Sequence, residues 1–177
     1  MVGRYAGVLK THMHGAVARS APPVQCGRIP AGPFALGGTM SRIASCSCGQ
    51  LVVTMKGDPT EVTVCHCFEC QKSTGSVFGV STYWPKSACD SIKGEAKLWR
   101  RSSDSGRWLD NYFCPVCGST VYWYAEFAPD EIGIAAGNFA DPGFPSPTSA
   151  VWDSCRHPWV KLPAEWPQDP RQGGLPE

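Results

Sequence analysis

The sequence predicts an all-β domain built from short strands. From Cys46 onwards, short runs of alternating apolar and polar residues are separated by Gly, Pro, Asn and Asp, and this spacing is typical of all-β proteins. Ten cysteines occur in 177 residues, most of them in close groups. No apolar signal segment follows Met1, so metal ions account for these cysteines better than disulfides do.

The length and charge of the chain exclude several classes of protein. A chain of 177 residues can form one domain with a real core. No apolar run approaches the ~20 residues that a membrane span needs, so we expect a cytoplasmic protein that does not insert into membranes. The formal net charge is +1 and no basic stripe with interleaved aromatic residues is present, so no nucleic-acid partner is expected. The oligomeric state is left open.

Residues 1–40 differ from the rest of the chain. Residues 1–39 contain no Asp or Glu, four basic residues and many Gly, Ala and Pro without periodicity, so we predict a disordered tail. Without it, 12 basic residues stand against 15 acidic ones. The tail weakly resembles an organelle transit peptide, and an alternative start at Met40 would make it a spurious extension. Its Cys26, His12 and His14 are expected to have no role.

Domain residues 41–163 begin with Cys46 and Cys48, before a predicted strand at 51–56 that ends at Gly57-Asp58-Pro59. A second strand, at 62–64, leads into Cys65-His66-Cys67-Phe68-Glu69-Cys70. On a strand that runs into a turn, Cys65 and Cys67 project to the same face, and Cys70 joins them from the turn.

Three thiolates on one tetrahedral ion leave its fourth position open, as in a catalytic zinc site. Cys65, Cys67 and Cys70 are therefore the candidate active centre. The alternative is a structural zinc completed by His66 or by another cysteine. His66 should face the opposite side of the strand, which disfavours a structural zinc completed by His66.

After a polar turn at 73–76, further strands are predicted at 77–83, 96–100 and 108–113, the last two forming a hairpin. Cys114-Pro115-Val116-Cys117-Gly118 then forms a metal-binding knuckle, in which the glycine permits the tight turn. A knuckle supplies half of a zinc site, and Cys46-x-Cys48 is the close pair left to complete it. The alternative is a redox-active Cys-x-x-Cys motif. Such a motif is expected within a βαβ pattern, and no such pattern surrounds these cysteines.

The remaining strands are predicted at 119–124 and 131–136, with a turn at Ala128-Pro129-Asp130 between them. The aromatic segment 151–159 either lines a pocket or caps the core. Residues 164–177 are rich in Pro and Gly and are expected to be loose.

The ordered motifs Cys-x-Cys-Gly, Cys-His-Cys-x-x-Cys, Ser-x-Gly, Phe-Cys-Pro-x-Cys-Gly, Ala-Gly-Asn and Pro-Trp resemble the glutathione-dependent formaldehyde-activating enzyme family, also called the CENP-V/GFA domain. The resemblance covers about Ser45 to Leu162. It implies a zinc-stabilised β-tent fold with two zinc ions, a structural one held by Cys46, Cys48, Cys114 and Cys117 and a catalytic one held by Cys65, Cys67 and Cys70. The chain departs from the family pattern at Gln71, where many members have arginine, and at Cys155, where many have serine. Cys89 matches nothing in the pattern.

The resemblance also implies a zinc-dependent carbon–sulfur lyase, similar to S-(hydroxymethyl)glutathione synthase, which joins glutathione and formaldehyde. Lys72 is a candidate partner for a substrate carboxylate, although a solvated surface lysine is the alternative. Ser73 and Gly75 are candidates for contacts with the ligand backbone, with an ordinary turn as the alternative. A competing function is a zinc-stabilised binding module without turnover, because the family includes a chromosome-associated protein.

Overall fold

The computed structural model describes residues 34–36, 39–103 and 106–172, and it confirms the predicted all-β class. Twelve strands form two sheets, and the described residues contain one α-helix, α1 (Phe68–Thr74), and three short 3-10 helices. Most neighbouring strands are antiparallel, as expected. The exceptions are the parallel pairs β4–β11 and β11–β12.

The smaller sheet has the order β1-β2-β3-β6. Its strands are β1 (Phe34–Leu36), β2 (Thr39–Ser45), β3 (Val52–Lys56) and β6 (Cys89–Lys93). The larger sheet has the order β12-β11-β4-β5-β10-β9-β8-β7. Its strands are β4 (Glu61–Cys65), β5 (Gly79–Pro85), β7 (Lys97–Ser102), β8 (Trp108–Phe113), β9 (Thr120–Ala125), β10 (Ala128–Ala135), β11 (Ser149–Val151) and β12 (Gln168–Asp169).

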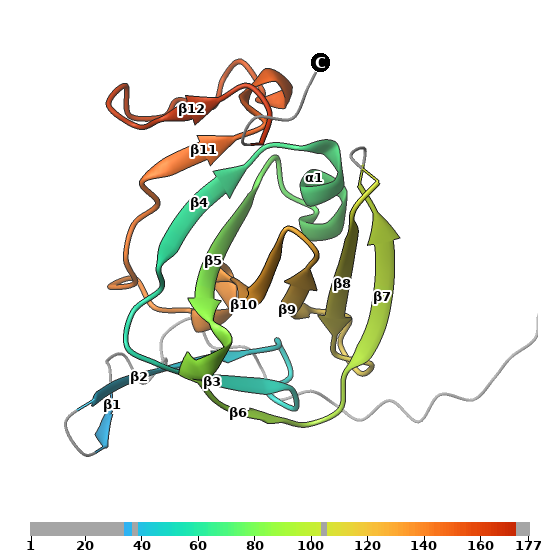
Figure 1. Ribbon diagram of the computed structural model, residues 1–177, viewed down its shortest axis with the longest axis vertical. Helices are drawn as coiled ribbons and strands as arrows, with labels where there is room; N and C mark the ends of the chain where they lie inside the picture. The colour runs from blue at the N-terminus through green and yellow to red at the C-terminus, as the bar shows by residue number, and fades with distance from the viewer. Residues whose placement is uncertain (1–33, 37–38, 104–105, 173–177) are drawn as a thin grey trace, which may run out of the picture.

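Figure 1 shows how the two sheets are arranged. The larger sheet curves, so that β4 and β5 lie on one side and β7 and β8 on the other, with β9 and β10 between them. The smaller sheet lies across one end of this curved sheet, and α1 lies at the opposite end. The helix therefore lies at the end of the curved sheet that is far from the smaller sheet.

The hydrophobic core lies between the two sheets. Alternate residues of β3, Val53 and Met55, are fully buried, and they belong to the same cluster as Trp84, Ile132 and Ile134 of the larger sheet. This alternation places one face of each strand in the core and leaves the other face free. The buried polar groups here are satisfied, since the Trp84 indole donates to Thr82 Oγ1 at 2.9 Å, which in turn donates to the carbonyl of Ile134 at 2.9 Å.

The predicted turn at Ala128-Pro129-Asp130 is wrong, because these residues begin β10 and the turn lies at residues 126–127. The pairing of β10 with β9 shifts register between Ala128 and Gly133. Proline is tolerated in a strand at such an irregularity, because the ladder there does not need its missing N–H group.

Most of the predicted disordered tail, residues 1–40, lies outside the described residues, which include β1 and the start of β2. The segment 164–172 is not loose, because β12 pairs with β11 and Trp152 N donates to the carbonyl of Arg171 at 2.7 Å. The domain limits at 41 and 163 stay a prediction. Among the described residues, no helix has the length and apolar character to cross a membrane.

Candidate metal centres and the cleft beside them

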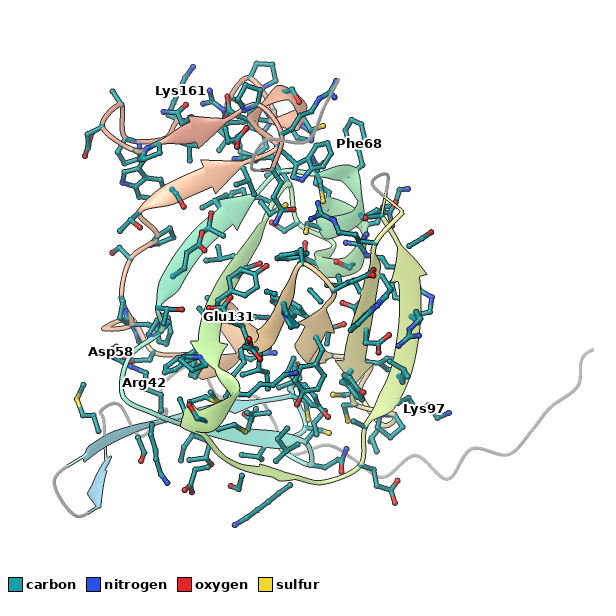
Figure 2. The ribbon with its side chains drawn as sticks, viewed as in Figure 1. Arg42, Asp58, Phe68, Lys97, Glu131 and Lys161 are labelled. Atoms are coloured by element: carbon teal, nitrogen blue, oxygen red, sulfur yellow. The ribbon has the colours of Figure 1, made fainter. Side chains whose placement is uncertain are left out.

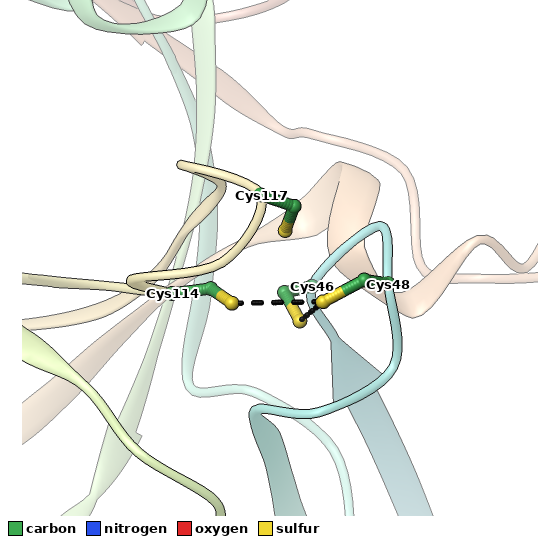
Figure 3. Close-up of side chains that lie close together, drawn as sticks. All are labelled: Cys46, Cys48, Cys114 and Cys117. Carbon is green, nitrogen blue, oxygen red and sulfur yellow. Dashed lines mark hydrogen bonds between the residues drawn. The ribbon is translucent and has the colours of Figure 1, made fainter. Parts of the chain in front are cut away.

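Four cysteines from two distant parts of the chain meet at one end of the core. Cys46 and Cys48 lie in the turn between β2 and β3, while Cys114 and Cys117 lie between β8 and β9 (Figure 3). All four sulfurs lie within 4.8 Å of one another, with 3.5 Å between those of Cys46 and Cys48 and 3.6 Å between those of Cys48 and Cys114. Sulfurs on a tetrahedral zinc with ~2.3 Å bonds stand about 3.8 Å apart, so this donor set fits a zinc ion.

Hydrogen-bond donors surround these sulfurs. Leu51 N lies 3.2 Å from Cys46 Sγ, and Val116 N lies 3.4 Å from Cys114 Sγ. The Gln50 side chain also donates to Cys114 Sγ at 3.3 Å, and a further bond from its amide to the carbonyl of Glu95, 2.7 Å long, fixes its position. Donors aimed at sulfur favour the thiolate, which is the form that binds metal.

Three further cysteines meet at the end of β4 and the start of α1. Cys65 is the last residue of β4, Cys67 is the N-cap of α1, and Cys70 lies in its first turn. Their sulfurs lie within 4.8 Å of one another, and no other Cys, His, Asp or Glu of the described residues joins this group. The predicted turn after Cys67 is a helix instead. The sulfur of Cys67 caps the start of this helix, because Cys70 N donates to Cys67 Sγ at 3.3 Å.

The three thiols of this group cannot all ionise without a neighbouring positive charge. Hydrogen bonds from Cys65 and Cys70 lower the pKa of Cys67 to about 2. The same contacts act in the opposite sense on the partners: the hydrogen bond with Cys67 raises the pKa of Cys65 to about 12, and those with Cys65 and Cys67 raise the pKa of Cys70. A divalent cation removes this conflict by compensating all three negative charges.

His66 does not join either cysteine group, as expected from its place between two of the cysteines. Its ring is completely buried and packs edge-on against Phe78, with 5.8 Å between ring centroids. Burial lowers the pKa of His66, so the ring is neutral at pH 7. The structure therefore does not place His66 as the fourth ligand of a structural zinc site.

The three cysteines open on a cleft of about 1490 Å³ along the free face of the larger sheet. Neighbouring strands contribute residues in register, with Glu61 opposite Tyr83, Tyr83 opposite Gly133, and Gly133 opposite Trp123. On the far wall, Asn111 lies opposite both Trp123 and Trp99. The cleft is thus lined both by aromatic rings and by many polar and charged side chains.

The residues predicted to contact substrate differ in position. Lys72 and Ser73 line the cleft, whereas Gly75 is not among the lining residues. Lys72 Nζ lies 2.8 Å from Glu69 Oε1, and its side chain is 73% exposed. Gly75 is the C-cap of α1 at φ 65°, and a Cβ built there meets no atom within 4 Å, so its conformation serves the end of the helix.

Gln71 ties α1 to the segment that follows β11. Its amide nitrogen donates to the carbonyls of His66 at 2.7 Å and Cys155 at 3.2 Å, and its oxygen lies 3.1 Å from His157 Nε2. Cys155 and Trp152 of the same segment line the cleft, so part of the aromatic segment 151–159 does line a pocket.

A family model described as "Glutathione-dependent formaldehyde-activating enzyme" matches residues 41–155. The chain belongs to this family. The family resemblance carried by the seven cysteines of the two groups is thereby confirmed. No curated protein matches the chain. Among solved structures, a crystal structure of a Rhodobacter sphaeroides protein is similar at 16% identity and a TM-score of 0.43, covering 54% of this chain and 85% of that one.

For this member of the formaldehyde-activating enzyme family, the structure brings together the cysteines that the sequence grouped as 46/48/114/117 and 65/67/70. The sequence did not indicate Tyr83, Trp123 or Arg101, which share the cleft with the second group. Each sits at an ordinary strand position, and only the curvature of the sheet turns it towards the cysteines.

Proposed function

We propose that the protein is a zinc-dependent carbon–sulfur lyase that acts on glutathione adducts, similar to S-(hydroxymethyl)glutathione synthase. The observation that supports this most directly is the three-cysteine group, which has no fourth ligand among the described residues and opens on the cleft. Cys65, Cys67 and Cys70 would hold a catalytic zinc, and Cys46, Cys48, Cys114 and Cys117 a structural one. When bound beside the cleft, zinc would supply the positive charge that favours an ionised substrate thiol.

In this reaction a carbon–sulfur bond forms between the glutathione thiol and the carbon of formaldehyde, and the thiol proton ends on the aldehyde oxygen. The reverse reaction breaks the same bond and returns the proton to sulfur. The contribution of the protein is to hold the two reactants together in the cleft. The aromatic rings along the cleft provide the walls for this.

Tyr83 is suited to hold the proton at the aldehyde oxygen. Burial raises the pKa of its phenol, so the hydroxyl keeps its proton at neutral pH. The ring of Trp123 packs edge-on against that of Tyr83, with 6.3 Å between the ring centroids. Negative charge on Cys65 and Cys70 also acts on this phenol, which indicates that Tyr83 lies near the three-cysteine group.

Calorimetric titration of the zinc-loaded protein with glutathione tests the proposal, followed by an assay of hydroxymethylglutathione formation above the spontaneous rate. We expect Cys67→Ser to abolish binding. Tyr83→Phe should bind glutathione as well as the wild type does but form the adduct roughly tenfold more slowly or worse, because one proton-holding group is lost. Glutathione binding that is unchanged in Cys67→Ser, or absent from the intact protein, would refute the proposal.

A further inference from the structure

The concave face of the larger sheet carries an arginine opposite α1. Arg101 lies on β7, two residues after Trp99, and both side chains line the cleft together with Cys65, Cys67 and Cys70. Arg101 lies near the C-terminal end of β7, and Figure 1 shows this end of β7 at the same end of the curved sheet as α1. The strand alternation that turns Arg101 inwards turns Arg100 to the other face, where it pairs with Asp110.

Arg101 differs from other arginines of the protein in having no carboxylate partner within the part of the chain that the structure describes. Arg42 pairs with Asp58 at 2.6 Å, Arg100 with Asp110 at 2.6 Å, and Arg156 with Asp153 at 2.7 Å. Arg101 is half-buried, so its charge is only partly screened by water. A half-buried guanidinium without a counter-ion costs free energy unless a ligand supplies the negative charge.

Arg101 and the three-cysteine group share one cleft, because the side chains of Arg101, Cys65, Cys67 and Cys70 all line it. If the sulfur of a substrate lies at these cysteines, other groups of the same substrate can therefore contact Arg101.

The guanidinium group is matched to carboxylates, because its planar fork donates two parallel hydrogen bonds. Glutathione carries two carboxylates, and fewer bonds separate the thiol from the glycine carboxylate than from the other one. Lys72 is a weaker candidate for this role, since it is 73% exposed and already paired with Glu69.

We propose that Arg101 binds the glycine carboxylate of glutathione and thereby selects this thiol over smaller, uncharged ones. This inference rests on the proposed function, because it takes the thiol group of the same ligand to lie at Cys65, Cys67 and Cys70.

The test is calorimetric titration of zinc-loaded full-length protein, with Arg101→Gln compared to wild type and to Lys97→Gln. The control removes the same charge from the same strand at an exposed position outside the cleft. Three ligands are used: glutathione, its ethyl ester at the glycine carboxylate, and 2-mercaptoethanol. Zinc content and circular dichroism verify that each variant is folded.

We expect Arg101→Gln to weaken glutathione binding about tenfold to a hundredfold, the loss typical of a hydrogen bond to a charged group. Lys97→Gln should bind as the wild type does, and Arg101→Lys should recover part of the affinity. The ester should bind wild type about as weakly as glutathione binds Arg101→Gln, with no further loss in that variant. Binding of 2-mercaptoethanol should be equal in all of these proteins.

Two results separate failure of this inference from failure of the proposed function. If Cys67→Ser abolishes glutathione binding while Arg101→Gln leaves it unchanged, the role of Arg101 is refuted and the proposed function stands. The same holds if the ester binds wild type as tightly as glutathione does. If the intact protein binds no glutathione, both are refuted.

Discussion

Single residues decide the shape of the cleft floor. Gly133 lies in the middle of β10, opposite both Tyr83 and Trp123. A Cβ built at this position would come to 2.0 Å from Trp123 Nε1. The glycine therefore allows the indole of Trp123 to lie close to β10, beside the ring of Tyr83.

We predict that Gly133→Ala lowers the free energy of unfolding by roughly 1 to 3 kcal/mol, the usual cost of forcing an extra methyl group into a packed site. Trp123 has to move, so its fluorescence should change as well. Urea unfolding followed by fluorescence measures both effects. The matched control is Gly137→Ala, where the added Cβ meets no atom within 4 Å. Equal stability of the two variants would contradict the prediction.

At the scale of elements, the β7–β8 hairpin forms the far wall of the cleft, and an ion pair between Arg100 and Asp110 adds to its backbone ladder. Arg100 Nε lies 2.6 Å from Asp110 Oδ1, and Arg100 Nη2 lies 2.7 Å from Asp110 Oδ2. Asp110 is buried, whereas Arg100 is largely exposed. The hydrogen bonds from Arg100 lower the pKa of Asp110 from its usual value of 3.8.

A lowered pKa in the folded state means that the ionised carboxylate stabilises the fold above the unfolded pKa, and that this contribution is lost as the pH falls. We predict that Asp110→Asn lowers the free energy of unfolding by roughly 1 kcal/mol at pH 7, since the exposed arginine is screened by water. The difference from wild type should shrink as the pH falls below 3.8, the usual value of this carboxyl.

Urea unfolding at a series of pH values measures this difference. Asp90→Asn is the control, because its partner Lys56 and Asp90 itself are both about half exposed, so little effect is expected. A destabilisation by Asp110→Asn that does not change between pH 7 and pH 3 would show that the ion pair is not its cause.

On the scale of the whole molecule, the four-cysteine group joins the two sheets. It connects the β2–β3 turn of the smaller sheet to the β8–β9 connection of the larger one, at one edge of the core. The three-cysteine group instead lies at the opposite end, at the start of α1, whose first residue Phe68 is labelled in Figure 2. If both groups bind zinc, loss of the first should affect stability and loss of the second should affect ligand binding.

We therefore predict two zinc ions per chain by elemental analysis, and one in a variant with Cys65, Cys67 and Cys70 all changed to serine. This variant should keep most of its thermal stability. The corresponding variant at Cys46, Cys48, Cys114 and Cys117 should unfold or lose much of its stability, because structural zinc contributes directly to folding free energy. Zero zinc in well-folded wild-type protein would contradict the division into two sites.

The sequence by itself determined the all-β class, the hairpin at 97–113, the family, and the grouping of seven cysteines. These depend on local patterns: alternation, turn residues and the close spacing of ligands that must meet at one ion. It missed α1, because a seven-residue helix capped by the sulfur of Cys67 leaves little periodicity to detect, and it misplaced the turn before β10, because the proline there lies at a break in strand pairing. Only the tertiary structure decided which residues face the three cysteines. Tyr83, Trp123 and Arg101 come from three different strands, and it is the curvature of the sheet that brings them to one cleft.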